Sequence, residues 1–183
     1  MPPIYEPAED SYLMSEAMDS EIPRLLKRNP ELNLLEIGVG SGINLITALN
    51  SGVKKENITG CDINEEAVEH CKKLGFNCIK SDLFSNIQGK HDVIIFNPPY
   101  LPLDKKEPEN SRAATTAGKK GNEIIVRFLE QAKNYLNKNG RVFVITSSLS
   151  ESVNFIKLGY KSKAVSSAKL FFEKLSLWEC LKI

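Results

Sequence analysis

The chain has 183 residues, of which 42% are hydrophobic and 26% are charged, so it can build an ordinary globular core. Its 24 basic and 23 acidic side chains give a net charge of +1, which excludes a strongly basic nucleic-acid coat and an acidic tail protein. The length predicts a single domain over residues 1–183. Residues 119–183 carry a basic excess (twelve Lys and Arg, five Asp and Glu), which we interpret first as a solvated face and second as a candidate partner surface.

Apolar runs and helical stretches alternate along the chain after an N-terminal helical segment, residues 1–30. We expect strands at 33–37, 57–62, 77–80, 92–96 and 141–146, and helices at 43–50, 64–75 and about 121–136. Runs rich in β-branched residues, separated by helices, predict an α/β fold: a parallel sheet with helices on both faces. Residues 160–166 and 171–181 predict a C-terminal hairpin, which leaves one strand antiparallel.

The cysteines and the N-terminus indicate the compartment. None of the four cysteines forms a C-x-x-C pair, and only His70 and His91 could assist them, so we expect free thiols and no zinc site. His70 is predicted on a helix face and His91 in a turn, with no catalytic role. The first residues lack the features of a signal peptide and no apolar run could span a bilayer, which predicts a cytoplasmic protein.

A glycine-rich turn follows the first predicted strand. It reads Glu36-Ile37-Gly38-Val39-Gly40-Ser41-Gly42, a G-x-G-x-G spacing with an acid two residues before it. A dinucleotide fingerprint would place Gly or Ala where Ile43 stands, and there is no P-loop lysine. Backbone amides beside a carboxylate suit a cationic amino-acid ligand better than a phosphate, although a plain tight turn has similar glycines.

Acids stand at the ends of three successive predicted strands: Glu36, Asp62 and Asp82. A carboxylate 20 residues beyond Gly42 suits the two hydroxyls of a ribose. One such acid could be a helix cap, but three at the same edge of the sheet indicate a ligand site.

Asn97-Pro98-Pro99-Tyr100 directly follows the fourth predicted strand. A planar amide or aromatic amine is a poor nucleophile until its hydrogens are held. The Asn97 side-chain carbonyl and the Pro98 main-chain carbonyl can each accept one N–H, and Tyr100 offers a flat face. We therefore expect residues 98–120 to form a substrate loop.

These motifs resemble the HemK/PrmC group of S-adenosylmethionine-dependent glutamine methyltransferases. Tyr5-Glu6-Pro7-Ala8-Glu9-Asp10-Ser11 is similar to the eukaryotic and archaeal branch. The resemblance covers nearly the whole chain, because it includes residues 117–122 and 173–176 in addition to the motifs above. The glycine turn alone would indicate only a class I methyltransferase.

The resemblance implies a class I, Rossmann-like fold with seven strands, and S-adenosylmethionine as the cofactor. Asn97, Pro98 and Tyr100 would be the catalytic residues. The implied cofactor-binding residues are Ser11, Glu36, Gly38, Gly42, Asp62, Ile63, Asp82, Leu83 and Asn97, with Asp62 at the ribose and Asp82 and Leu83 at the adenine.

The resemblance also implies a protein substrate, the glutamine of a Gly-Gly-Gln motif in a translation termination (release) factor. A small zinc-binding activator would add a strand to the sheet edge at 77–80, where Phe76, Cys78 and Ile79 could favour pairing. Residues 114–118 depart from the large residue and paired glycines usual in the family, so contacts with the substrate can differ there.

Other acceptors and other classes of protein remain open. The Asn-Pro-Pro-Tyr motif also suits the exocyclic amine of adenine or cytosine in nucleic acid, but no base-recognition module fits within the chain. A protein lysine would need deprotonation rather than paired carbonyls. A catalytically silent binding subunit would be favoured if Asn97 or the glycines were missing, and Ile43 disfavours an NAD-dependent oxidoreductase.

Overall fold

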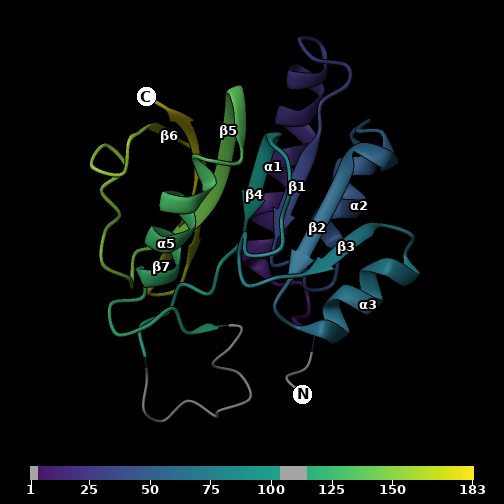
Figure 1. Ribbon diagram of the computed structural model, residues 1–183. Coiled ribbons are helices and arrows are strands. Elements are labelled where there is room, and N and C mark those ends of the chain that lie inside the picture. Colours follow the sequence, from purple (N-terminus) through teal and green to yellow (C-terminus); the bar gives the residue numbers. More distant parts are fainter. Residues whose placement is uncertain (1–3, 104–114) are drawn as a thin grey trace.

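A single mixed sheet forms the centre of the protein (Figure 1). The computed structural model describes residues 4–103 and 115–183. The strands are β1 (Leu34–Ile37), β2 (Ile58–Asp62), β3 (Asn77–Lys80), β4 (His91–Phe96), β5 (Leu136–Ser147), β6 (Tyr160–Leu170) and β7 (Glu173–Lys182). The helices are α1 (Glu9–Leu26), α2 (Ile43–Asn50), α3 (Glu65–Lys73) and α5 (Glu123–Ala132), with a short 3₁₀ helix at Lys55–Asn57.

The strand order is β3-β2-β1-β4-β5-β7-β6. Strands β1 to β5 are parallel to one another, whereas β7 runs antiparallel to both β5 and β6. This arrangement confirms the expected class I fold, with seven strands and a C-terminal antiparallel hairpin. Strands β1 to β3 are added toward one edge of the sheet and β4 and β5 toward the other, so the strand order switches between β1 and β4, where open α/β sheets bind ligands.

Helices cover both faces of the sheet, and the central strands are accordingly apolar at nearly every position. In β4, Val93 and Ile95 face the core shared with α1, α2 and α3, while Ile94 and Phe96 face the core shared with α5. A side-chain period of two sends successive residues to opposite faces. The uninterrupted apolar runs in the sequence therefore reflect a sheet that is buried on two sides.

Two local predictions were wrong. The helix expected to reach Leu136 ends at Ala132, because Leu136 already pairs with His91 as the first residue of β5. His91 lies in β4 rather than in a turn, and it is buried. Pairing between strands overrides local helix preference here, and burial lowers the pKa of the His91 imidazole.

The β3 strand forms one edge of the sheet, as expected, and β6 forms the other. Phe76 and Cys78, however, are buried in the protein's own core, so only the backbone of β3 and the half-buried Ile79 remain for a partner. Within the predicted loop 98–120, residues 104–114 lie outside the described residues. None of the described helices is long and apolar enough to cross a membrane.

Candidate active site

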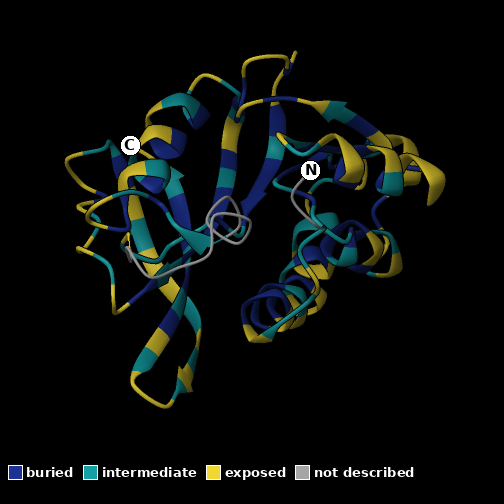
Figure 2. Ribbon diagram, turned by 90° about the horizontal axis from the view of Figure 1, so that it is seen from below, coloured by how far each residue is buried: buried dark blue, intermediate teal, exposed yellow. Residues whose placement is uncertain are grey.

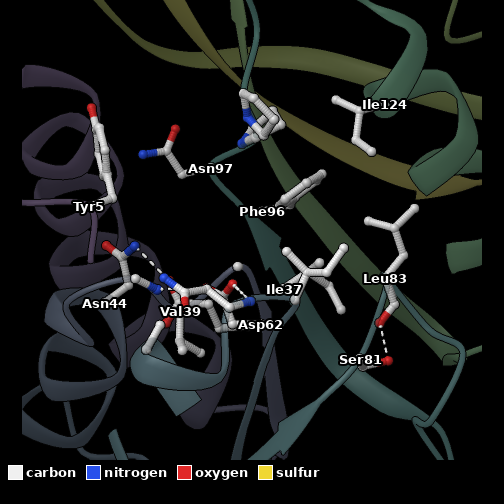
Figure 3. Close-up of a pocket in the computed structure, with 18 of the residues that line it drawn as sticks. Tyr5, Ile37, Val39, Asn44, Asp62, Ser81, Leu83, Phe96, Asn97 and Ile124 are labelled. Carbon is white, nitrogen blue, oxygen red and sulfur yellow. Dashed lines mark hydrogen bonds between the residues drawn. The ribbon is translucent and has the colours of Figure 1, made fainter. Parts of the chain in front are cut away.

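A cavity of about 600 Å³ opens where β1, β2 and β4 end (Figure 3). Nine of the residues predicted for the site line it: Ser11, Glu36, Gly38, Asp62, Ile63, Asp82, Leu83, Asn97 and Pro98. Gly42 and Tyr100 do not. The volume falls within the range typical of small-molecule sites.

Residues 38–41 of the glycine turn line one side of the cavity. Gly38 has a φ of +71°, and a Cβ there would lie 3.4 Å from the Phe96 ring, so a side chain would be both strained and crowded. Gly42 has a φ of +80° at the start of α2, but its missing side chain leaves room for Cys71 and Leu74. Gly42 therefore allows α3 to pack closely, and its contact with the cofactor stays a prediction.

Glu36 is buried at the end of β1, with 1% of its surface exposed. The Asn44 amide in α2 donates to Glu36 Oε1 at 2.8 Å, whereas Glu36 Oε2 has no hydrogen-bond partner within the described structure. Burial raises the pKa of the Glu36 carboxyl well above its usual range. A cationic group in the cavity would satisfy the free oxygen and reverse this shift.

Asp62 holds the turn and also faces the cavity. Its carboxylate accepts the Gly40 amide at 3.0 Å and the Asn64 amide at 2.8 Å. Burial raises the pKa of the Asp62 carboxyl, and these amides oppose that rise. Each carboxylate oxygen can still accept a second hydrogen bond, for example from a hydroxyl group.

The third strand end carries a more exposed part of the site. Arg127 Nη2 in α5 lies 2.5 Å from Asp82 Oδ1, and both side chains are about half exposed. Ser81 Oγ donates to the Leu83 carbonyl at 2.8 Å, which supports the left-handed backbone of Leu83 (φ +49°). Leu83, Phe96 and Ile124 add apolar walls (Figure 3). Ile63 lines the same cavity, and these side chains together suit a flat, uncharged ring.

Asn97 follows β4 and points into the cavity on the side of Tyr5 (Figure 3). Its Oδ1 atom is buried and has no hydrogen-bond partner among the described residues. The same is true of Glu36 Oε2 and Asn44 Oδ1, so three buried, unsatisfied acceptors belong to residues that line one cavity. Buried acceptors are normally satisfied, and this set therefore indicates a ligand that donates hydrogen bonds.

Tyr100 serves the loop rather than the cavity wall. Its hydroxyl donates to Asp10 Oδ2, its amide donates to the Thr115 carbonyl, and its carbonyl accepts from Ser150 Oγ. Burial, followed by the Asp10 charge, raises the pKa of the Tyr100 phenol. Tyr100 thereby fixes the segment that carries Asn97 and Pro98.

The N-terminal segment closes one side of the cavity. Tyr5, Asp10 and Ser11 all line it, and the Tyr5 hydroxyl donates to Asp10 Oδ2 at 3.0 Å. The Ser11 amide donates to Asp10 Oδ1 at 2.6 Å, and the Ser11 hydroxyl donates to the same atom at 3.2 Å.

Sequence reasoning gave no role to four of these residues. Tyr5 and Asp10 belong to the quoted N-terminal motif, but their hydrogen bonds depend on how that segment folds back. Asn44 and Arg127 come from helices, α2 and α5, where no motif marks them. The available signal was their place in the helices. Asn44 lies in the first turn of α2, next to the cavity-lining Ile43, and Arg127 lies three residues after Ile124, on the same face of α5.

The residues present fit S-adenosylmethionine. This cofactor carries an ammonium group, a ribose with two hydroxyls and an adenine ring. The cavity offers a carboxylate oxygen that no described residue satisfies, a second carboxylate at the next strand end and an apolar slot flanked by Asp82.

Comparisons with known proteins agree with this geometry. The family model for the methyltransferase small domain matches residues 13–169. The "Putative protein N5-glutamine methyltransferase MJ0928" of Methanocaldococcus jannaschii is 41% identical, over 95% of this chain and 89% of its own length. The eRF1 methyltransferase catalytic subunit mtq2 of Schizosaccharomyces pombe is 31% identical, over 78% of this chain and 71% of its own length.

Among solved structures, the E. cuniculi Mtq2-Trm112 complex contains a chain with the same fold (TM-score 0.69, 23% identity, all of both chains covered). The chain therefore belongs to the methyltransferase small domain family and, within it, to the HemK2/Mtq2-type glutamine N5-methyltransferases, which are S-adenosylmethionine-dependent enzymes.

Proposed function

We propose that the protein methylates the side-chain nitrogen of the glutamine in the Gly-Gly-Gln motif of a translation termination factor. The observation that carries this proposal is the buried Asn97 Oδ1 at the cavity, which has no hydrogen-bond partner in residues 4–103 and 115–183. Two relatives support the choice of substrate: the S. pombe subunit is an eRF1 methyltransferase, and the E. cuniculi complex methylates the eRF1 termination factor.

Asn97 and Pro98 would orient the acceptor. A glutamine amide has two N–H donors in one plane, and the carbonyls of Asn97 and Pro98 can accept one each. This pairing aims the nitrogen lone pair into the cavity and stabilises positive charge that develops on nitrogen. When bound, S-adenosylmethionine supplies a methyl group on a cationic sulfur. Tyr100, held by Asp10, would keep both carbonyls in position.

We assign the cofactor contacts to the three strand ends. Glu36 would take the ammonium group, Asp62 the ribose hydroxyls, and Asp82 with Leu83 the adenine edge. Gly38 allows close approach of the backbone. Ile63 and Ser11 line the same cavity, so we retain them as cofactor-binding residues.

We also propose how the parts of the chain divide the work. Residues 1–183 act as one methyltransferase domain. Within it, residues 1–30 cover the cofactor site, because Tyr5, Asp10 and Ser11 line the cavity. The loop 98–120 receives the substrate. The four free, buried cysteines suit the reducing conditions of the cytoplasm.

A small zinc-binding activator is a further proposed partner. The E. cuniculi enzyme forms a complex with Trm112. In this chain the backbone of edge strand β3 is where an added strand could pair.

The test is methyl transfer from labelled S-adenosylmethionine, with and without such an activator. The substrates are a recombinant termination factor, the same factor with its motif glutamine changed to alanine, a lysine-rich protein and duplex DNA. Label is expected only on the intact factor. Label on DNA, on lysine or on the factor without its glutamine would contradict the proposal.

A further inference from the structure

The turn between β6 and β7 consists of two phenylalanines that fold stability does not explain. Phe171 is 98% exposed and Phe172 is 96% exposed. Phe171 has a φ of +38°, a left-handed conformation that bulky residues disfavour, and two-residue hairpin turns normally use Asn, Asp or Gly. The pair therefore adds backbone strain and exposes two aromatic rings.

Two lysines flank this turn. Lys169 and Lys174 stand directly opposite each other in the hairpin, and like charges in that position repel. Among the described residues neither lysine has an ion-pair partner. The neighbouring Glu173 carboxylate turns inward and accepts from Ser147 Oγ. The turn thus presents two rings between two uncompensated positive charges.

Hydrogen bonds through residues 148–150 connect the turn to Tyr100 in the substrate loop. The Ser148 amide donates to the Lys174 carbonyl at 2.9 Å, and Ser150 Oγ donates to the Tyr100 carbonyl. Leu149, between these serines, is 49% exposed. Ser147, at the carboxyl end of β5, pairs with Leu175 near the start of β7. The turn therefore lies at the end of the sheet where the parallel strands finish, and Asn97 lies at the same end. Figure 2 shows the hairpin projecting from the body on the side of α1, with exposed residues at its tip.

We propose that Phe171 and Phe172, with Lys169 and Lys174, dock the protein substrate beside the target glutamine. This inference rests on the proposed function. The complementary surface on the termination factor would be an apolar patch bordered by carboxylates. Position favours the substrate over an activator, because β3 and β6 are opposite edges of the sheet.

The test compares steady-state kinetics of the full-length enzyme and three variants, with activator present where the wild type needs it. Phe171→Asn with Phe172→Gly places the preferred residues in the turn, so the fold should survive. Ile156→Asn is the matched control, because Ile156 is 66% exposed near the opposite end of β6. Lys169→Gln with Lys174→Gln tests the charges without touching the turn.

The Phe variant should raise the KM for the termination factor about tenfold or more, as expected for loss of aromatic anchors, and leave kcat and cofactor affinity within about twofold. The Lys variant should raise the same KM and flatten its increase with salt. The Ile156 control should match the wild type.

Other outcomes overturn the inference in distinguishable ways. If the wild type methylates the factor and the Phe and Lys variants have its KM, docking at the turn is wrong while the proposed function stands. If the variants lose activator binding or a dimer seen in sedimentation, the turn serves that partner instead. If the wild type does not methylate the factor, the proposed function fails and the inference fails with it.

Discussion

The Tyr100 hydroxyl donates to Asp10 at 3.2 Å, and this bond joins two segments that are 90 residues apart in the chain. One segment begins α1 and the other carries the acceptor-orienting carbonyls. Tyr5 and Ser11 donate to the same carboxylate. Asp10 is therefore the point at which the N-terminal cover and the substrate side of the cavity are fixed to each other.

Asp10→Ala should lower the free energy of unfolding by about 2–3 kcal/mol, because it leaves the buried donors of Ser11 and the half-buried hydroxyls of Tyr5 and Tyr100 without their acceptor. Urea denaturation measures the change. Asp19→Ala is the control, since Asp19 accepts one exposed bond from Ser51 and should cost about 0.5 kcal/mol or less. Equal losses in the two variants would show that the carboxylate of Asp10 has no special role.

Asn97→Ala should reduce methyl transfer about 100-fold or more, because the acceptor loses a positioned carbonyl where charge develops. Cofactor affinity, measured by calorimetry, should stay within about threefold. Asp62→Ala should do the reverse and weaken cofactor binding about tenfold or more through lost hydrogen bonds. Loss of cofactor binding in Asn97→Ala would mean that this residue mainly holds the cofactor.

Glu36 makes cofactor binding depend on pH. Burial raises the pKa of its carboxyl, whereas an ammonium ligand needs the charged form, so affinity should rise with pH until that pKa is passed. Through Glu36, the stability of the cofactor-free protein depends on pH in the opposite direction and falls as pH rises. A raised carboxyl pKa stabilises the fold at low pH, and this contribution declines as pH rises from the unfolded-state pKa through the folded-state pKa.

Glu36→Gln should weaken cofactor binding. It should also remove the pH dependence of cofactor affinity and of the free energy of unfolding that Glu36 causes. Calorimetry and urea denaturation across pH provide the measurements. An unchanged pH profile of affinity in the variant would assign the dependence to another group.

Gly42→Ala and Gly89→Ala separate strain from packing. Both glycines have a φ of +80°, but a Cβ at Gly42 would lie 3.0 Å from Cys71 Sγ, whereas a Cβ at Gly89 would meet no described residue within 4 Å. Gly89→Ala should cost about 1–2 kcal/mol from backbone strain. Gly42→Ala should cost about 1–3 kcal/mol more from overpacking against α3. Equal losses in denaturation would rule out the packing role.

Sequence reasoning reached the fold and the cavity because both depend on local patterns. Buried strands appear in the sequence as apolar runs, and acids such as Asp62 at their carboxyl ends meet at the same end of the sheet. It failed where distant pairing decides the outcome, as at Leu136, which joins β5 because His91 lies beside it. It also missed Asn44 and Arg127, whose roles come from how their helices lie on the sheet.

Gly42 shows what spacing alone leaves out. The motif predicts that Gly42 contacts the cofactor, which stays a prediction, and the structure adds that a Cβ at this position would lie closest to Cys71 and Leu74. The spacing of the motif indicates that position 42 requires a glycine, but only the packing of the folded chain shows which neighbours would clash with a side chain there.

The position of β7 has a consequence for how the chain folds as it is synthesised. β7 is made after β6, yet it lies between β5 and β6 in the sheet. While the chain is growing, β6 therefore has no neighbour to pair with and the edge of β5 stays open until residues 175–181 emerge. Nascent chains at this stage expose one unpaired strand, β6, and one open strand edge, on β5. During this period chaperone capture and aggregation compete with completion of the sheet.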